Sequence, residues 1–405
     1  MKVLRHFSRI FVGLVFIFSG TVKAVDPLGS AYKFTDYFQA FHLDFLQPFA
    51  LAFAIILCTA EFISGFSVLS GYRLKWGIRG VMILMLIFTP LTLILAVNNP
   101  VSDCGCFGDA IHLTNWQTFG KNVILMTFAI IIFTGRKEAK QIFNPLKEWA
   151  VIYMMAGLFV IFSLLNLRYL PLFDFLPYKT GVNIPDNMKI PEGEPTDEYR
   201  TTFIYEKNGL RKEFSLDNYP ASDSTWKFID QKSVLIKKGY TPPIHDFSIT
   251  SPNGEDLTVK ILSDKGYTFL MISKKLAEAR RRYLEKGYEL GARCQLEEIG
   301  FYVITASGTE EMKESENGFT FCSADETTLK TIIRANPGFV LLKEGTIQGK
   351  WSWSNLPPKE LFVKDMSDEQ IRRINNKSPV LVVYSSAICV TMFFLLIISF
   401  FRRNK

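Results

Sequence analysis

The sequence predicts a polytopic α-helical membrane protein with a large α/β domain outside the membrane. Hydrophobic residues make up 48% of the 405 residues while charged residues reach 21%, so the two kinds must be segregated along the chain. Six apolar runs are long enough to cross a bilayer, which takes about 20 helical residues. A polar segment, residues 171–378, separates the fifth run from the sixth. These three observations together define the fold class.

The six predicted spans are apolar runs flanked by basic residues. They lie near Ile10–Val25, Phe49–Ser70, Gly77–Val97, Trp116–Thr134, Trp149–Leu170 and Pro379–Phe401. Basic residues before the first run are also typical of a signal peptide, but no A-x-A cleavage site follows, and we interpret the run as a retained helix. The first four spans form a four-helix unit over residues 1–140. Residues 141–170 add a fifth span, and residues 379–405 contain the sixth and a short tail.

The positions of the basic residues predict the orientation in the membrane. Clusters of Lys and Arg precede the first span, lie between the second and third and between the fourth and fifth, and follow the sixth. All four clusters fall on one side, which the positive-inside rule assigns to the cytoplasm. The loop 98–115 contains no Lys or Arg. We therefore expect both termini to be cytoplasmic, and the loop 98–115 and residues 171–378 to be extracytoplasmic.

The outer segment divides into three regions. Residues 171–241 are expected to be rich in β-structure, and Asn208-Gly209 predicts a hairpin within them. Residues 242–356 alternate predicted strands and helices, which indicates an α/β layer architecture. The predicted elements are strands Tyr267–Ser273, Gly300–Ser307 and Phe319–Ser323, helices Lys274–Glu289 and Asp325–Ala335, and a hairpin over Gly338–Trp351. Residues 357–378 form a linker to the sixth span.

Two cysteines one glycine apart are the strongest chemical signal in the chain. Cys104 and Cys106 lie in the second outer loop, at the predicted surface of the bilayer. Thiols pair in an oxidising compartment unless they are used, and a disulfide across Cys-Gly-Cys closes a very small, strained and hence reducible ring. Gly105 tolerates the backbone torsions of such a ring, and Gly108 predicts a second tight turn. Three interpretations remain open, which are a redox-active dithiol, a structural clip, and a thiolate metal site assisted by His112.

Glu61 is an acidic residue inside a predicted span. A charge at the centre of a membrane helix costs on the order of 2.5–3.5 kcal/mol, so such residues are usually paired and functional. Lys23 and Lys121, near the outer ends of their spans, are candidate partners, and the alternative is that both extend to the interface. Cys58 and Cys389 also lie within spans and are interpreted as small apolar residues.

The end of the outer α/β domain resembles the second half of the thioredoxin fold. In that family a proline, usually cis, begins a strand, and a hairpin with a Lys-x-Gly turn follows. Here Pro337 leads "GFVLLKEGTI", and the earlier stretch "PPIHDFSI" is similar to membrane-anchored thioredoxin-like proteins of bacterial envelopes. The family's CxxC pair would follow the first core strand, where this sequence reads "ISKKLAEA". The resemblance over residues 242–356 implies a thioredoxin-like domain that lacks its own dithiol and serves as a docking surface.

Two cysteines remain in this domain. Cys322 ends a short predicted strand and is expected at the edge where the family carries its active site. Cys294 precedes a strand and is expected at the opposite edge. A bridge between them is not expected, because the Cα atoms of bridged cysteines lie within about 7 Å of each other. Cys322 could take part in thiol exchange, and the alternative for both is a small buried apolar residue.

The motif "CGCFGD" between two membrane spans resembles the MauE/DoxX group of bacterial redox-associated membrane proteins. The first-span region "RIFVGLVFIFSGTVKAVDPLGSAYKFTDYF" and the second-span stretch "AEFISGFSVLSG" are similar as well, and the resemblance covers residues 1–140. MauE-type proteins are linked to disulfide formation in exported proteins, and DoxX-type proteins to membrane oxidoreductase complexes. The resemblance implies that Cys104 and Cys106 are the dithiol of a protein in a bacterial inner membrane.

Our first hypothesis is a membrane thiol–disulfide exchange protein in which Cys104 and Cys106 cycle between dithiol and disulfide. Its expected partners are the lipid bilayer and an envelope thiol or disulfide protein. A quinone inside the bundle is a candidate electron partner, although no residue requires it. The alternatives are a non-enzymatic scaffold that binds an envelope protein through its outer domain, and copper or zinc handling by Cys104, Cys106 and His112. The net charge of +7 lies in small basic clusters, which predicts no nucleic-acid partner.

Overall fold

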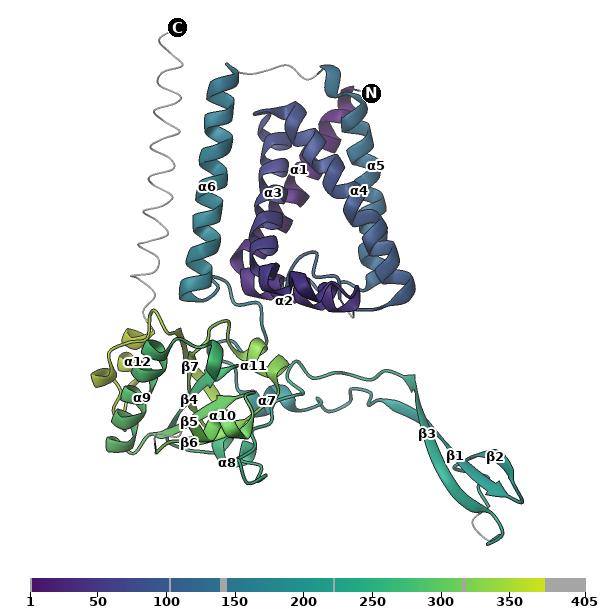
Figure 1. The fold of residues 1–405 in the computed structure, drawn as a ribbon, viewed down its shortest axis with the longest axis vertical. Coiled ribbons are helices and arrows are strands. Elements are labelled where there is room, and N and C mark those ends of the chain that lie inside the picture. Colours follow the sequence, from purple (N-terminus) through teal and green to yellow (C-terminus); the bar gives the residue numbers. More distant parts are fainter. Residues whose placement is uncertain (1, 102, 139–143, 221–222, 315–317, 376–405) are drawn as a thin grey trace. The chain divides into compact units, whose positions relative to one another are not determined.

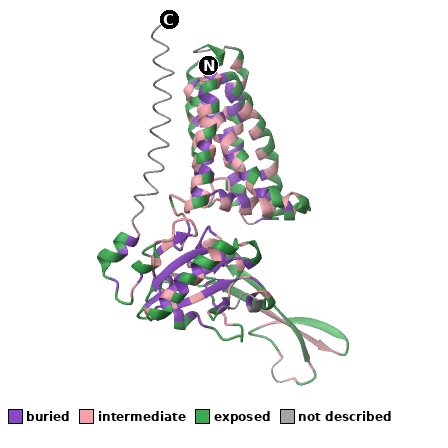
Figure 2. Cartoon of the chain, turned by 60° about the vertical axis from the view of Figure 1, so that its left-hand side comes forward, coloured by how far each residue is buried: buried purple, intermediate pink, exposed green. Residues whose placement is uncertain are grey.

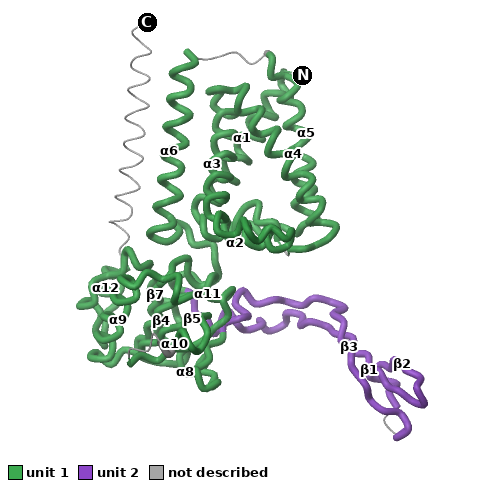
Figure 3. The backbone as a smooth tube through the Cα atoms, viewed as in Figure 1, with its two compact units in different colours: residues 1–181, 248–405 green, residues 182–247 purple. Residues whose placement is uncertain are grey.

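The computed structural model describes residues 2–101, 103–138, 144–220, 223–314 and 318–375. The sixth predicted span, Pro379–Phe401, lies outside these residues. The chain forms two compact units, residues 1–181 together with 248–405, and residues 182–247 (Figure 3). The first unit contains the long helices and a five-stranded sheet, and the second contains a three-stranded sheet.

Among the residues that the structure describes, five helices of the first unit are long and apolar enough to cross a membrane (Figure 1). They are α1 (Lys2–Val25), α3 (Ala50–Ser70), α4 (Leu74–Asn98), α5 (Asn115–Thr134) and α6 (Pro145–Tyr169). Exposed apolar side chains, such as Ile83 and Ile124, cover the outer faces of these helices, as expected for contact with lipid (Figure 2). The helices confirm the first five predicted spans and indicate a multi-pass membrane protein.

Helices α1 and α3 pack closely because glycines lie at their contact. A Cβ atom on Gly65 of α3 would lie 2.8 Å from the carbonyl oxygen of Gly13 in α1. A Cβ atom on Gly20 of α1 would lie 2.7 Å from the carbonyl oxygen of Cys58 in α3. Small residues at such contacts let membrane helices approach each other. The close approach brings the side chains of α1 within reach of Glu61 on α3.

Between α1 and α3 the chain forms a helix that the sequence analysis did not predict. This helix, α2 (Pro27–Ala40), has proline at its first position, and the Asp26 side chain accepts a hydrogen bond from the Gly29 amide at 2.9 Å. Phe38 of α2 packs edge-to-face on Phe53 of α3, with ring centroids 5.6 Å apart. Capping and aromatic packing therefore stabilise α2 against the bundle.

A mixed five-stranded sheet forms the rest of the first unit. Its strands are β4 (Tyr267–Ser273), β5 (Gly300–Thr305), β6 (Thr320–Ser323), β7 (Gly338–Lys343) and β8 (Thr346–Ser352). The strand order is β6-β5-β4-β7-β8, in which β4, β5 and β6 are parallel and β7 is antiparallel to both its neighbours. All seven residues of β4 are buried, as expected for a central strand (Figure 2). The predicted strand Tyr267–Ser273 and the predicted C-terminal hairpin are confirmed.

The helix predicted at Lys274–Glu289 is displaced along the chain. The observed helix, α9, spans Arg281–Leu296, and the residues that precede it form an irregular segment with a 3₁₀ turn. The amide of Leu276 in this segment donates to Ser307 Oγ at 2.9 Å. A tertiary contact to the loop after β5 thus holds these residues outside the helix, and helical periodicity in the sequence does not record such a contact.

Helix α11 (Glu326–Ile332) is shorter than the helix predicted over residues 325–335. Asp325 caps its first turn, as expected, but Ile333 is extended and the chain then reaches a cis Asn336-Pro337 bond before β7. The remaining short elements of this unit are η1 (Asp44–Phe49), η2 (Arg136–Glu138), α8 (Thr258–Leu262), η3 (Leu276–Glu278), α10 (Thr309–Glu314), η4 (Lys359–Leu361) and α12 (Asp368–Ile374).

The second unit contains a three-stranded antiparallel sheet and one short helix. Helix α7 (Ile184–Met188) is followed by strands β1 (Glu198–Lys207), β2 (Leu210–Ser215) and β3 (Lys227–Lys237), in the order β2-β1-β3. Asn208 and Gly209 have φ angles of 52° and 79° at the turn between β1 and β2. This turn confirms the hairpin predicted from the Asn-Gly pair.

Candidate functional site

The two thiols of the Cys-Gly-Cys motif lie side by side. Sγ of Cys104 and Sγ of Cys106 are 3.0 Å apart in the loop between α4 and α5, and both cysteines are free. Cys104 is only 9% exposed, and Cys106 is half-buried. The sulfur atoms of a disulfide lie about 2.05 Å apart. A small movement of either side chain would therefore bring the pair to bonding distance.

Two glycines with positive φ shape this loop. The φ angles of Gly105 and Gly108 are 64° and 53°, which side chains with a Cβ atom rarely adopt. The Asp103 carboxylate accepts a hydrogen bond from the Gly105 amide at 3.0 Å, and the Gly108 amide donates to the Gly105 carbonyl at 3.0 Å. A Cβ atom on Gly105 would also lie 2.9 Å from Cγ of Lys33. The glycines and the carboxylate thus keep the two cysteines adjacent.

Side chains from three helices anchor the loop. The hydroxyl of Tyr37 on α2 donates to the carbonyl oxygen of Cys104 at 2.5 Å. Ser19 Oγ on α1 lies 2.9 Å from the carbonyl oxygen of Cys106. Asn115, at the start of α5, donates to a backbone carbonyl near the start of the loop at 2.9 Å. These three residues could not be found from the sequence, because single hydrogen bonds to backbone carbonyls leave no motif in it.

A buried ion pair lies next to this loop. Lys23 Nζ is 2.7 and 2.8 Å from the two carboxylate oxygens of Glu61, which is 2% exposed, and 3.0 Å from Ser19 Oγ. Ser19 Oγ is also 3.0 Å from Glu61 Oε2, so a continuous polar chain links the ion pair to the backbone of Cys106. Lys23 is therefore the partner of Glu61 inside the bundle, and the alternative that it extends to the interface is wrong.

Hydrogen bonding and nearby charges favour ionisation of one thiol of the pair. The hydrogen bond with Cys104 lowers the pKa of Cys106, and the positive charges of Lys121 and Lys23 lower it further against the opposing effect of burial. The same hydrogen bond and burial raise the pKa of Cys104. Lys121 Nζ itself lies 4.3 Å from the centroid of the Phe107 ring. Cys106 is thus the thiol that ionises first, and only a thiolate attacks a disulfide.

His112 lies on the exposed side of the loop. Its side chain is 70% exposed, and its Nδ1 is 3.6 Å from Asp103 Oδ2. Lys33 Nζ approaches the same carboxylate oxygen at 3.7 Å. Among the residues that the structure describes, no three His, Cys, Asp or Glu side chains are grouped so that they could hold a metal ion. The described part of the chain therefore provides no ligand set for the copper or zinc alternative.

An apolar cavity of about 460 Å³ lies beside the dithiol. Its walls come from α1, α2, α3, α4, α5 and the Cys-Gly-Cys loop, and they include both Cys104 and Cys106. Lys23, Glu61 and Asn122 are among its polar lining residues, while Phe, Leu, Ile and Met side chains form most of its apolar wall. Both cysteines therefore border a cavity inside the helix bundle.

Comparison with known proteins gives a family match for the part of the chain that carries the dithiol. Residues 1–135 match methylamine utilisation protein MauE. The match covers α1 to α5 and the Cys-Gly-Cys loop, and it confirms the predicted resemblance to MauE. We call residues 1–135 the MauE-like part. Residues 199–238, which include β2, β3 and all of β1 except its first residue, match a domain of unknown function, DUF8463. Searches of curated proteins and of solved structures found no match to the chain.

Two basic side chains next to the five-stranded sheet contact the MauE-like part. Arg334, between α11 and β7, is 7% exposed and donates to Asp26 Oδ2 and Asp109 Oδ2, both at 2.7 Å. Lys274, directly after β4, forms a hydrogen bond with the Tyr32 hydroxyl on α2. Burial lowers the pKa of Lys274 to about 7, with a further contribution from the Arg334 charge. Because Asp109 ends the "CGCFGD" motif, Arg334 connects the sheet domain to the dithiol loop.

Pro337 lies at the edge of the sheet where β4 ends. The Asn336-Pro337 bond is cis, and Asn336 Oδ1 accepts a hydrogen bond from Ser273 Oγ at 2.8 Å. Asn336 Nδ2 donates to the Lys275 carbonyl at 3.0 Å. The segment "ISKKLAEA", where the thioredoxin resemblance would place a CxxC pair, therefore lies next to this proline.

The other described cysteines are buried. Cys322 in β6 and Cys294 in α9 are both 0% exposed, and burial raises the pKa of Cys322 to about 11 and of Cys294 to about 12. Cys294 lies within the helix and not in the connection before β5, because α9 extends further along the chain than predicted. Cys58 is buried in α3, and Cys389 lies outside the described residues. In this structure none of these described thiols is accessible to a partner.

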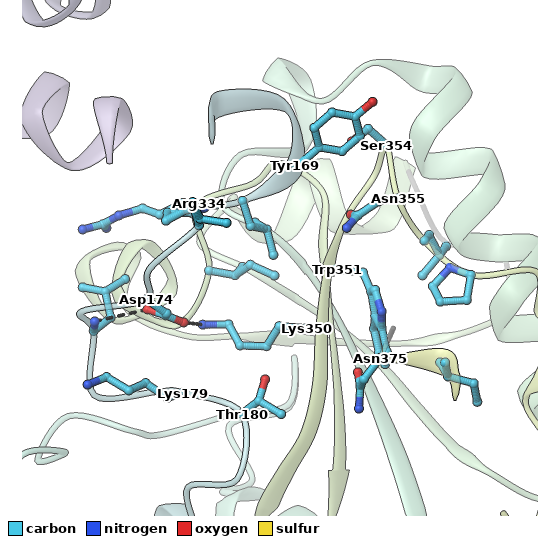
Figure 4. Close-up of a pocket in the computed structure, with 18 of the residues that line it drawn as sticks. Tyr169, Asp174, Lys179, Thr180, Arg334, Lys350, Trp351, Ser354, Asn355 and Asn375 are labelled. Atoms are coloured by element: carbon cyan, nitrogen blue, oxygen red, sulfur yellow. Dashed lines mark hydrogen bonds and ion pairs between the residues drawn. The ribbon is translucent and has the colours of Figure 1, made fainter. Parts of the chain in front are cut away.

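A second cavity, of about 840 Å³, lies at the end of α6 and along β8. Figure 4 shows Lys350 pointing toward Asp174, and the two side chains form an ion pair at 2.7 Å. Lys179, Trp351 and Asn375 also line this cavity (Figure 4). None of the described residues that line it is a cysteine. The cavity beside the dithiol is therefore the one that bears on thiol chemistry.

Proposed function

We propose that the protein is a membrane thiol–disulfide exchange protein of a bacterial cytoplasmic membrane, with Cys104 and Cys106 as its redox pair. The observation that carries this proposal is the 3.0 Å separation of the two Sγ atoms, in a loop that is hydrogen-bonded to a buried ion pair through Ser19. The resemblance to MauE supports the proposal, because it implies a link to disulfide formation in exported proteins.

The different acidities of the two thiols set the order of the exchange. The Cys106 thiolate attacks one sulfur of a partner disulfide and forms a mixed disulfide, while the other partner sulfur leaves as a thiolate. Cys104 then loses its proton, attacks Sγ of Cys106 and releases the second partner thiolate. The partner gains two electrons, and the cysteine pair loses two as its own disulfide forms. The reverse sequence transfers two electrons from a partner dithiol to the pair.

The orientation that we propose places the dithiol loop outside the cytoplasm. The loop lies where α4 ends and α5 begins, and the basic residues Arg73, Arg136 and Lys147 lie near the opposite ends of the helices. Basic residues concentrate in cytoplasmic loops of membrane proteins, which supports this assignment. An outer position gives the pair access to the disulfides and thiols of exported proteins.

For the sheet domain we propose a thioredoxin-like role without its own redox pair. The strand order β6-β5-β4-β7-β8, the antiparallel β7–β8 hairpin and the cis proline before β7 support a thioredoxin-like arrangement. Lys274 and Lys275 occupy the segment after β4 where that family carries cysteines. The ion pairs of Arg334 with Asp26 and Asp109 would hold this edge beside the dithiol loop, where the domain can position a partner.

Differential thiol labelling in cells tests the proposed function. We expect Cys104 and Cys106 to change from oxidised to reduced when reductant is added, whereas the buried Cys58 keeps one labelling state. The Cys104→Ser/Cys106→Ser double variant should alter the disulfide content of envelope proteins, and Cys58→Ser is the matched control that should not. A pair that never changes state, together with unaltered envelope disulfides in the double variant, would refute the proposal.

A membrane scaffold is the second candidate function. The observation that favours it is the missing cysteine pair at the sheet edge, where Lys274 is buried against Tyr32. Affinity purification of the full chain after cross-linking separates the two candidates. Recovery of the same partner with Cys104→Ser/Cys106→Ser, together with an unchanged phenotype, would favour the scaffold. Loss of a disulfide-linked partner in that variant would favour thiol exchange.

A further inference from the structure

We infer that the apolar cavity beside Cys104 and Cys106 binds a quinone, which accepts the electrons of the reduced pair. This inference rests on the proposed function, because the pair must cycle between dithiol and disulfide. A pair that oxidises exported proteins is itself reduced in each cycle. It therefore needs a two-electron acceptor within reach of its sulfur atoms.

The size and position of the cavity favour a lipid-soluble ligand. Its volume of about 460 Å³ falls within the range of about 300–1,000 Å³ that small-molecule sites occupy. Ile56 on α3 and Ile87 on α4 both line the cavity and are 65% and 55% exposed on the outer surfaces of membrane-spanning helices. The cavity is thus continuous with a lipid-facing surface between α3 and α4. A ligand that is dissolved in the bilayer can enter there, and a hydrophilic oxidant cannot.

The polar groups of the wall suit the head group of a quinone. Lys23, Glu61 and Ser19 are joined by hydrogen bonds, and the chain that they form ends at the backbone of Cys106. The Lys121 charge acts on the Cys106 thiol, so it lies near the same point of the wall. Quinone carbonyl oxygens accept hydrogen bonds, and negative charge develops on them during reduction. Cationic and donor groups near the thiols would stabilise that charge, while the apolar remainder accommodates an isoprenoid tail.

The electron and proton balance of the step is complete with a quinone as oxidant. The S–H bonds of Cys104 and Cys106 break, an S–S bond forms between the two Sγ atoms, and two electrons and two protons are released. The quinone takes up both electrons and both protons, and two O–H bonds form in the hydroquinone. Glu61 lines the same cavity as both thiols, so its carboxylate is the acidic group of the wall that can accept one of the released protons before the quinone takes it up.

The test uses the reduced full chain in lipid nanodiscs with ubiquinone-1 as the probe. The ring of this quinone is fully substituted, so it does not add covalently to thiols. We expect one quinone to be reduced for every two thiols lost. Absorbance measures the loss of the quinone, and maleimide labelling measures the loss of thiols. Ala60 on α3 lines the cavity, and Ala60→Phe should fill it and slow quinone reduction by about tenfold or more. Ala52→Phe, on the lipid-exposed face of the same helix, is the matched control and should react like the wild type.

Oxidation by the water-soluble reagent diamide distinguishes failure of this inference from failure of the proposed function. We expect diamide to oxidise the pair equally in the wild type and in Ala60→Phe, and protection of the buried Cys58 thiol from maleimide shows that the variant is folded. If diamide oxidises the pair but ubiquinone-1 does not, or if Ala60→Phe reduces the quinone at the wild-type rate, the quinone site is wrong and thiol exchange stands. If neither oxidant changes the pair, the proposed function itself fails.

Discussion

Removal of the Glu61 carboxylate is expected to destabilise the helix bundle far more than removal of the whole ion pair. The Lys23 and Glu61 side chains are 9% and 2% exposed, and Lys23 Nζ lies 2.7 and 2.8 Å from the carboxylate oxygens. In Glu61→Gln the ammonium group keeps Ser19 but loses its counter-charge. Breaking a buried pair from one side costs about 3–5 kcal/mol, whereas replacing both partners by apolar residues is often neutral or stabilising. We therefore expect Lys23→Met/Glu61→Leu to recover most of the loss.

Equilibrium unfolding of the full chain in mixed micelles measures this difference. The free energy of unfolding is compared between the wild type, Glu61→Gln, Glu61→Leu, Lys23→Met and the double variant. We expect each single loss to exceed the loss in the double variant by about 3 kcal/mol or more. Lys121→Met is the matched control, since Lys121 contacts the Phe107 ring and forms no ion pair that the structure records, and it should cost about 1 kcal/mol or less. Losses of Lys23→Met and Glu61→Leu that add up to the loss of the double variant would refute the coupling.

Three further predictions concern the contacts around the dithiol loop. Arg334→Ala leaves two carboxylates without their partner and should lower the free energy of unfolding by about 3–5 kcal/mol, whereas Arg281→Ala, which breaks an exposed pair, should cost about 0–1 kcal/mol. Because burial lowers the pKa of Lys274 to about 7 from about 10.4 in the unfolded chain, the unfolded state binds more protons between these values, and the thermal midpoint should rise with pH over that window. The Lys274→Met variant should flatten this rise. An unchanged slope of the thermal midpoint against pH would contradict the assignment of this pH dependence to Lys274. Gly105→Ala forces a Cβ atom onto a residue with φ of 64° and should cost about 1–2 kcal/mol and slow oxidation of the pair by diamide, whereas Gly120→Ala, where a Cβ would contact nothing, should do neither.

Much of the fold could be predicted from the sequence because it depends on local hydrophobic pattern. The five described membrane helices, strand β4 and both hairpins follow from apolar runs and from turn residues such as Asn208-Gly209 and Glu344-Gly345. Helix α2 was missed, because its sequence mixes polar and aromatic residues and its stability depends on the Asp26 cap and on packing against α3. The start of α9 was placed too early, because the bond from Leu276 to Ser307 is a tertiary contact.

The candidate site could be predicted only where its residues form a motif or violate an expectation. The Cys-Gly-Cys motif is visible in the sequence, and Glu61 stands out because charges in membrane spans are costly. Arg334 could not be found in this way, since it is an ordinary arginine whose partner Asp26 lies 308 residues away along the chain. Tyr37 was missed for the same reason, because only the folded chain brings its hydroxyl to the carbonyl of Cys104.

Trapping a mixed disulfide tests the central claim most directly. In Cys104→Ser the attacking thiol Cys106 remains, but the cysteine that would resolve the mixed disulfide is gone. We predict that this variant accumulates a disulfide-linked envelope protein, which non-reducing electrophoresis and mass spectrometry identify. Cys106→Ser should trap less, because the remaining Cys104 side chain is only 9% exposed and burial still raises the pKa of its thiol, and the double variant should trap none. Equal adducts in all three variants, or no adduct through Cys106 at all, would contradict thiol exchange by this pair.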